Sequence, residues 1–316
     1  MKRSRGSKSA SGTALRSGSF TATSLLLVAS AIPAIARPPL YESAGQSTQI
    51  LVSYVENENA DFDPPVDGET GGQRTDIKGL WDLGDPGGFA LGYSHQYDSL
   101  DIDLAEDEVL SNGHHHTIAI PVHWHRRLDD GDEISLSLAP ALSVSSNVLK
   151  DLDLADSDAV QLWGSALYRI GGANVDWLLG VNHDYRFGEG KVYPVVGGEW
   201  ANETTIVRIT YPDITANWQF SERWSLDASV SPDGNRWRVW DRDRNIDSDF
   251  EREAWRAELA LIYGLPGGWS IGLTAGYSWD VSWDFEKSAQ ETARPDSDSQ
   301  GFAGLHISWL PTTRRR

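Results

Sequence analysis

Apolar and polar residues alternate with a period of two along most of the chain, from Ser47 to Trp309. Residues 214–220 show the pattern most clearly, because every second side chain is apolar and the others are polar and uncharged. The same alternation occurs in residues 134–144 and 175–184. Successive side chains of a β-strand point to opposite faces, so the pattern predicts strands; no stretch has the apolar stripe of an amphipathic helix.

The links between these segments alternate between short and long. Tight turns are expected at residues 84–87, 129–132, 171–174, 201–203, 221–222 and 265–268, and longer, mostly acidic links at 57–72, 98–113, 145–157, 241–250 and 285–300. Outer-membrane barrels have short periplasmic turns and long extracellular loops, so we predict an all-β fold, an antiparallel transmembrane β-barrel of about 12–14 strands. A soluble β-sandwich also alternates, but small and polar residues on the second face suit a lumen.

The N-terminal 36 residues have the features of a cleavable secretory signal. Five Lys and Arg precede the apolar run at residues 25–29, and Ala34-Ile35-Ala36 offers a small-x-small cleavage site. No stretch approaches the ~18–20 apolar residues that a spanning helix needs. We therefore expect a signal peptide at 1–36, a periplasmic segment at 37–46, the barrel at 47–310 and a basic tail at 311–316, in a protein of the outer membrane.

Composition limits the possible partners and stabilising chemistry. The chain has no Cys, which excludes disulfides and a lipid-modified N-terminal Cys. Without residues 1–36 it carries 22 Lys and Arg against 46 Asp and Glu, a formal charge of −24, which argues against nucleic acid as a partner. The 14 Trp suit the aromatic girdles of a membrane barrel. No cofactor is expected, since Gly188-Glu189-Gly190 lacks the strand-to-helix context of a phosphate-binding loop.

The end of the chain carries a pattern similar to the terminal-strand signal that the barrel-insertion machinery reads. The residues that fill its places are Phe302, Gly304, Ile307 and Trp309. Such chains usually stop at the aromatic residue, whereas here residues 310–316 follow. The pattern predicts that the insertion machinery, outer-membrane lipids and lipopolysaccharide are partners. Divalent ions are expected to bridge the acidic loops to lipopolysaccharide phosphates.

Short motifs in the middle of the chain carry a family resemblance. Tyr193-Pro194, the glycines at 197 and 198, and Pro212-Asp213 lie within the segment 190–218. These motifs resemble those of an uncharacterised group of proteobacterial outer-membrane β-barrel proteins, and a looser similarity extends to Tyr277. The resemblance implies a barrel in the outer membrane and no particular activity. Both Pro elements are interpreted as turn and strand-edge punctuation, since Pro cannot donate a ladder hydrogen bond.

A group of histidines is the first candidate for chemistry. His114, His115 and His116 precede His123 and His125 on one predicted strand, whose lipid face is defined by Ile118, Ile120, Val122 and Trp124. The inner face then carries His115, His123 and His125. Residues two apart on a strand stand roughly 7 Å apart, so His123 and His125 are a candidate metal pair. The alternative is that they bond lumen carboxylates near the periplasmic mouth.

Charged residues of both signs are predicted to face the lumen. Charges inside a barrel can select solutes by field and size, or neutralise one another in a closed interior. The candidate pore-lining residues are Arg74, Asp76, Lys78, Asp176, Asp184, Arg208, Asp227, Arg256, Glu258 and Asp280, with Asp82 and Arg169 on the same predicted face.

The role that these patterns favour is a porin-like channel for passive or selective passage of a small solute. A pore-less structural or surface-interaction barrel that acts through its acidic loops is the alternative. A barrel enzyme comes third: His306 and Ser308 have the two-residue spacing of a phospholipase-type barrel but face inward, and Asp184 beside His183 is a faint echo of a protease-type barrel. No catalytic residue is predicted.

Overall fold

The computed structural model describes residues 49–63, 68–83, 88–104, 113–128, 131–151, 155, 157–241, 246–288, 291–293 and 295–310. The expected signal peptide, periplasmic segment and basic tail lie outside these residues. The described strands are β1 (Gln49–Asp61), β2 (Gly68–Asp82), β3 (Phe89–Leu104), β4 (His114–Ala119), β5 (Val122–Arg127), β6 (Glu133–Ser145), β7 (Val160–Ile170), β8 (Val175–Phe187), β9 (Glu189–Ala201), β10 (Thr205–Tyr211), β11 (Ile214–Gln219), β12 (Trp224–Pro232), β13 (Asn235–Asp241), β14 (Ile246–Gly264), β15 (Trp269–Ser288), β16 (Glu291–Ala293), β17 (Asp296–Ser297) and β18 (Gln300–Trp309).

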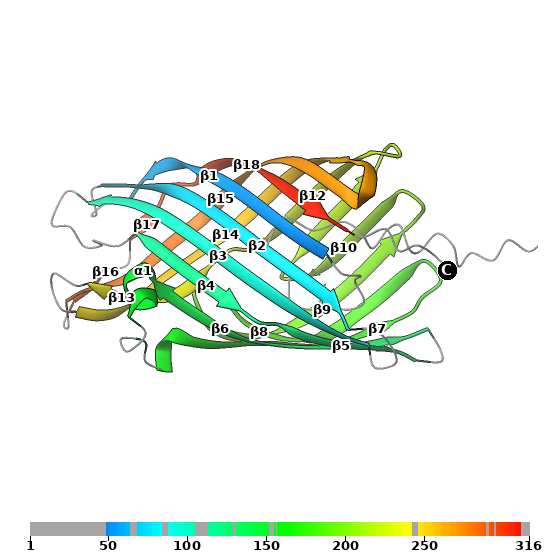
Figure 1. Ribbon diagram of the computed structural model, residues 1–316, viewed down its shortest axis with the longest axis horizontal. Helices are drawn as coiled ribbons and strands as arrows, with labels where there is room; N and C mark the ends of the chain where they lie inside the picture. Colours follow the sequence, from blue (N-terminus) through cyan, green and yellow to red (C-terminus); the bar gives the residue numbers. More distant parts are fainter. Residues whose placement is uncertain are drawn as a thin grey trace, which may run out of the picture.

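These strands form one closed antiparallel barrel (Figure 1). Each strand pairs with the next along the chain, and β18 pairs with β1 from Ile50↔Trp309 to Asn57↔Phe302. Three strands of the wall are each broken into shorter pieces. β4 and β5 both pair with β3 and β6, β12 and β13 both pair with β14, and β16, β17 and β18 all pair with β15. Joining the pieces across these breaks gives 14 strands in the described chain, which confirms the predicted fold class.

The outward face of the barrel is a band of exposed apolar side chains, and a soluble protein would bury a surface of this kind. Members from around the wall are Ile50, Ile77, Leu138, Leu162, Val192, Ile209, Leu261, Leu273 and Ile307. Exposed aromatic residues gather at the turn end, namely Trp81, Phe89, Trp177, Trp200, Trp218, Trp224 and Trp269. An apolar band with an aromatic girdle at its edge is the lipid-facing surface of an outer-membrane barrel. The protein is therefore located in the outer membrane.

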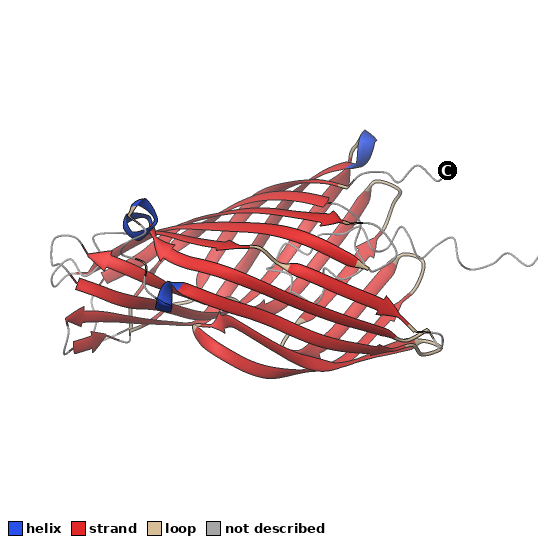
Figure 2. Ribbon diagram, turned by 60° about the horizontal axis from the view of Figure 1, so that its bottom comes forward, coloured by secondary structure: helices blue, strands red, loops and turns tan. Residues whose placement is uncertain are grey.

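The two ends of the barrel differ, as the loop lengths predicted. Compact links, including the 3-10 turn η5 (Pro266–Gly268), lie at the end of the barrel where β18 stops (Figure 1). Helix α1 (Ser146–Lys150) and the 3-10 turn η4 (Ser157–Ala159) lie at the other end (Figure 2). Much of what was expected to be outer loop is strand, namely residues 57–61, 68–72, 98–104, 246–250 and 285–288. No helix in the described ranges has the length and apolar character to span a membrane.

Candidate functional site: a flap across the lumen

Neighbouring strands of the wall reach very different heights at the outer end. Strands β14 and β15 have 19 and 20 residues, whereas β10 and β11 have 7 and 6. Next to this low stretch of rim, β8 turns into β9 at Gly188, and β10 turns into β11 after the cis Tyr211–Pro212 bond. Along its outer length, β14 forms its ladders with β13 and β15. We call β13 and residues 246–254 of β14 the flap.

The flap leans over the low rim and reaches the far wall. Arg238 of β13 pairs in parallel with Val144 of β6, and Glu253 of β14 pairs with Phe187 of β8. Neither β6 nor β8 is a wall neighbour of β13 or β14. The approach is close: a Cβ added to Gly234 would lie 2.3 Å from the carbonyl oxygen of Arg252 and 2.6 Å from that of Arg186. Only glycine fits at this base of the flap.

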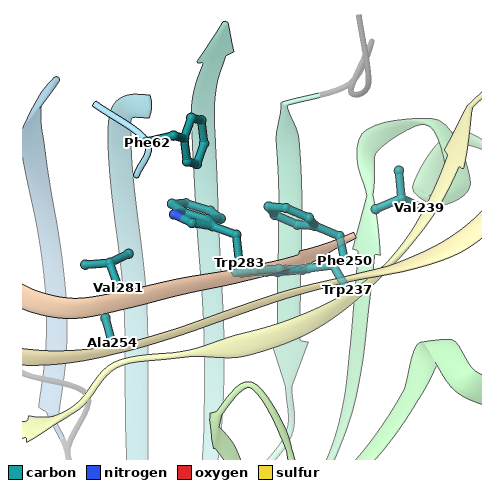
Figure 3. Packing of buried hydrophobic residues seen from close by; sticks show 7 residues of the cluster. All are labelled: Phe62, Trp237, Val239, Phe250, Ala254, Val281 and Trp283. Carbon is teal, nitrogen blue, oxygen red and sulfur yellow. The ribbon is translucent and has the colours of Figure 1, made fainter. Parts of the chain in front are cut away.

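Aromatic side chains pack between the flap and the opposite wall (Figure 3). The ring centroids of Trp237 and Phe250, both in the flap, are 5.6 Å apart, and Trp283 of β15 lies another 5.6 Å from Phe250. From the opposite wall, His115 of β4 stacks 5.0 Å from Phe250. Phe62, which follows β1, meets Trp283 edge-on at 6.4 Å. These aromatic residues, with Leu100 and Ile102 of β3 packed against them, bridge the interior at its outer end.

Hydrogen bonds fix the edge of the flap to the far wall. The Asn235 amide donates to the hydroxyl oxygens of Thr117, at 2.6 Å, and Ser143, at 3.1 Å. The carbonyl oxygen of Arg236 accepts from the Ser143 hydroxyl at 2.6 Å and from the Gln161 amide at 2.7 Å. Four strands, β13, β4, β6 and β7, are thereby joined across the lumen. These groups are buried, and a buried polar atom without a hydrogen-bond partner would destabilise the fold. Each of these bonds avoids that cost.

Buried ion pairs lie beneath the flap. Arg74 of β2 contacts Asp98 at 2.6 Å and, across the lumen, Asp233 at 2.7 Å. Asp233, next to the flap's base, also accepts from Arg252 at 3.0 Å. Removing one member of such a set would leave the others buried and unpaired, which costs more than the pair contributes. The set therefore ties the position of the flap to the fixed wall.

A second set of buried charges holds the low rim together, and we call it the rim network. The guanidinium of Arg186 donates to Asp184 at 2.8 Å and to both oxygens of Asp213 at 2.6 and 3.2 Å. The hydroxyl of Tyr193 accepts from Arg186 at 2.5 Å and donates to Asp184 at 2.6 Å. Tyr193 and Asp213 are the residues interpreted from the sequence as turn punctuation, so that interpretation missed the role of their side chains.

Farther toward the periplasmic end, several inward polar atoms are buried but lack a hydrogen-bond partner in the protein. They are Oδ1 of Asp76, Oγ of Ser165, Oδ2 of Asp227 and both ring nitrogens of His306. Buried polar atoms are normally satisfied by protein, water or a ligand. This part of the interior therefore suits water or a polar solute.

The predicted pore-lining residues are distributed between these sets. Arg74 and Asp184 belong to the ion pairs just described, and Arg256 contacts Glu258 at 2.9 Å on the same strand. Asp76 and Asp227 are buried on the inner face and Lys78 is half-buried there. Arg208 contacts Glu199 at 2.5 Å, while Arg169 contacts Glu199 at 3.2 Å and Asp176 at 3.6 Å.

Asp280 departs from the expected orientation. It is exposed and has a φ of 54°, close to the register shift between Glu253 and Trp255 on the neighbouring strand. Val281 and Trp283 follow on the inner face. The bulge thus takes Asp280 out of the alternation. Asp82, at the end of β2, is also exposed.

The predicted histidine pair is not assembled as a multi-ligand metal site. His123 is buried on the inner face with Nδ1 2.7 Å from the Ser137 hydroxyl, and His125 is half-buried near the periplasmic end. Within the residues that the structure describes, no three or more His, Asp or Glu are grouped to hold a metal ion. Metal binding by His123 and His125 stays a prediction.

The residues of the expected assembly signal all lie in β18, which closes the barrel. Phe302 faces inward under the Arg256 guanidinium, 3.5 Å from the ring centroid, and Ile307 faces outward. Gly304 lies in contact with β1, where an added Cβ would come within 2.3 Å of the Tyr54 carbonyl oxygen. The Trp309 ring meets Trp269 at 6.2 Å. Their role in assembly stays a prediction.

The flap itself was missed in the sequence, where residues 241–250 were expected to be an outer loop. A signal was present: Trp237 and Val239, then Phe250, Arg252 and Ala254, alternate in the same way as the wall strands. Asp233, Asn235 and Arg186 carried no comparable signal, because their contacts come from strands distant in sequence.

The sequence matches no protein-family model and no curated protein. Solved structures similar to this chain include an outer membrane channel from Pseudomonas putida F1, with 8% identity, a TM-score of 0.43, and coverage of 84% of this chain and 96% of that one. The toluene transporter TodX of Pseudomonas putida has 12% identity, a TM-score of 0.33 and coverage of 86% and 92%. The outer membrane protease OmpT of Escherichia coli has 6% identity, a TM-score of 0.29 and coverage of 84% and 97%.

Proposed function

We propose that the protein is an outer-membrane channel for small polar solutes, and that the flap closes it in the conformation described here. Barrels of about 8 strands are filled by their own side chains, whereas those of 16 to 18 strands leave an aqueous channel. A wall of 14 strands lies between these cases. Here a folded-over segment bridges the interior at one end, which is the observation that carries the proposal.

The chemistry of the inner face supports passage of a polar rather than an apolar solute. Below the flap the interior presents Ser135, Ser137, Ser225 and Thr274 together with charges of both signs. The polar atoms that have no protein partner need water or a polar solute to satisfy them. The proposal assigns no catalytic step to the chain. The resemblance to uncharacterised outer-membrane barrels supports the fold and adds no solute.

The flap also favours a second candidate function, a pore-less barrel that acts through its outer surface. The test is conductance in planar lipid bilayers. We expect the wild-type protein to open rarely, and a variant lacking residues 235–251 to conduct steadily at a level about tenfold higher or more, since the outer constriction is gone. Retention of the folded barrel is checked by its heat-dependent shift in gel mobility. A correctly folded deletion variant that stays silent would establish the pore-less alternative.

A further inference from the structure

A cluster of imidazoles lies outside the lumen, on the lipid-facing side of β3 and β4. His95, Tyr97 and Ser99 alternate with the buried, inward Gln96 and Asp98. On β4, His114 and His116 flank the buried His115. The register places Tyr97 opposite His116 and Ser99 opposite His114. Three imidazoles from two strands therefore share one small outer patch.

Two of these rings meet directly. Nε2 of His95 lies 3.1 Å from Nδ1 of His116, the ring centroids are 5.4 Å apart and the planes differ by 20°. Such rings meet nearly end to end. Facing nitrogens at this distance cannot both carry a proton, so one donates and the other offers its lone pair.

The other ring nitrogen of His116 contacts a serine. Nε2 of His116 lies 2.8 Å from Oγ of Ser146, at the start of α1. When this nitrogen donates to the hydroxyl, Nδ1 of His116 is unprotonated and faces His95. A hydrogen-bonded second ring nitrogen is the usual support of a metal-ligating histidine, because it fixes the tautomer and raises ligand basicity.

We propose that His95 and His116 form a two-imidazole clamp for a divalent transition-metal ion such as Cu²⁺ or Zn²⁺. With metal–nitrogen bonds of about 2.0–2.1 Å, two ligand nitrogens lie roughly 2.9 Å apart at a right angle and roughly 3.3 Å apart at the tetrahedral angle. The separation of 3.1 Å falls between these values. The ion replaces the shared proton, which moves to Nδ1 of His95 or to solvent.

Binding needs only a modest rearrangement of side chains. From their end-to-end arrangement, both rings must turn by roughly 40° for the two lone pairs to converge, and χ2 of histidine is a soft torsion. Ile77 and Ile118 pair with His95 on the two neighbouring strands, and Tyr97 and Ser99 follow His95 toward the outer end of β3. Both histidines are partly exposed, so the remaining coordination positions are reachable from outside the barrel. This inference does not depend on the channel.

The test is metal titration of the untagged, refolded protein in detergent micelles at neutral pH, followed by calorimetry with Zn²⁺ and by electron paramagnetic resonance with Cu²⁺. We expect the wild type to bind one ion more than the H95A/H116A double variant, with nitrogen couplings in the copper spectrum. H95A and H116A should each weaken binding by about tenfold or more, and S146A should weaken it less.

Two matched controls distinguish this clamp from other histidines. His114 lies on the same outer patch but contacts Tyr97 and Ser99, and His123 is buried in the lumen. H114A and H123A should keep the high-affinity ion. Equal binding by the wild type and the double variant would overturn the proposal, as would loss of the ion in H114A or H123A alone. The gel-mobility shift confirms that each variant is folded.

Discussion

The two halves of the barrel interior are held together in different ways. At the outer end, side chains join strands that lie far apart in the wall: Asn235 bonds Thr117 and Ser143, and Arg74 contacts Asp233. Toward the periplasm, the contacts run along the wall between adjacent strands. Those contacts include His123 with Ser137, Asn217 with Asp227, Ser270 with Ser308, and Arg208 with Glu199.

The contacts that close the lumen are therefore different from the contacts that hold the wall together. Contacts between adjacent strands are compatible with any lumen width, because the backbone ladder already fixes those strands. Contacts across the lumen exist only while the flap lies inside the barrel. Substitutions at the outer end should therefore change both stability and conductance, whereas those at the periplasmic end should change stability alone. The predictions below test that separation, beginning with the largest effect.

Trp237→Ala should have the largest effect. Trp237 is 1% exposed and packs on Phe250 and His115, so its truncation should lower the free energy of unfolding by about 3–5 kcal/mol. It should also raise the conductance of the barrel. The measurements are denaturant unfolding in detergent micelles and single-channel recording.

Trp218→Ala is the matched control, because this Trp is 51% exposed on the lipid-facing surface at the turn end. It should leave the conductance unchanged. Equal conductance changes in both variants would remove the distinction between the two halves of the interior.

Asp213→Asn should have the next largest effect. The substitution keeps the shape of the side chain but removes a charge that accepts two bonds from Arg186 in the rim network. A hydrogen bond to a charged group contributes about 1.5–3 kcal/mol to stability. The free energy of unfolding should therefore fall by roughly that amount. Because Gly234, at the base of the flap, lies against the backbone of Arg186, conductance should rise as well. An unchanged conductance with reduced stability would show that the rim network supports the wall and not the flap.

Ser137→Ala should have a small effect. It removes the hydroxyl that lies 2.7 Å from Nδ1 of His123, between adjacent strands of the periplasmic half. The expected loss is about 0.5–1.5 kcal/mol of unfolding free energy, typical of one hydrogen bond. Conductance recordings should match the wild type, and a clear change would place a constriction in this half too.

The smallest effect concerns a periplasmic turn, outside the membrane. The Tyr168 hydroxyl and the Gly171 amide donate to the Asp132 carboxylate and hold its pKa below the usual range. A carboxyl group with a lower pKa in the folded state stabilises the fold above its unfolded pKa of about 3.9 and loses that contribution as the pH falls through the folded value. Tyr168→Phe should therefore unfold at slightly lower temperature at pH 7, and the difference should vanish in strong acid. If the difference in unfolding temperature between the wild type and Tyr168→Phe persists in acid, its cause is packing of the ring and not the bond to Asp132.

The wall of the barrel could be predicted from the sequence because each strand carries its own signal. Alternation in residues 134–144 assigns Leu136 and Leu138 to lipid and Ser135 and Ser137 to the interior, and the structure confirms this. His123 and His306 face inward for the same reason. Lipid and lumen differ strongly in polarity. The alternation of apolar and polar residues therefore shows which side chains of a strand face outward, even when the partner strand is not known.

The alternation in the flap indicates a strand, but it does not indicate that this strand leaves the wall. Residues 235–241 alternate Trp and Val with Arg, which suits a wall strand, while the charges around residues 241–250 suit a loop. The choice depends on Thr117, Ser143 and Phe187, which come from strands distant in sequence. The metal clamp was missed for a related reason. His95 and His116 are 21 residues apart, and only the register of β3 with β4 places them in contact.

Gly234 has a consequence for the history of this protein. Its backbone lies so close to Arg252 and Arg186 that any side chain would displace the flap, so the site tolerates one amino acid for as long as the flap is retained. Relatives with glycine at this position should also keep the long β13–β14 hairpin. Lineages that lost the hairpin should be free to vary there. One position in an alignment would then separate flap-bearing barrels from those with an unobstructed outer mouth.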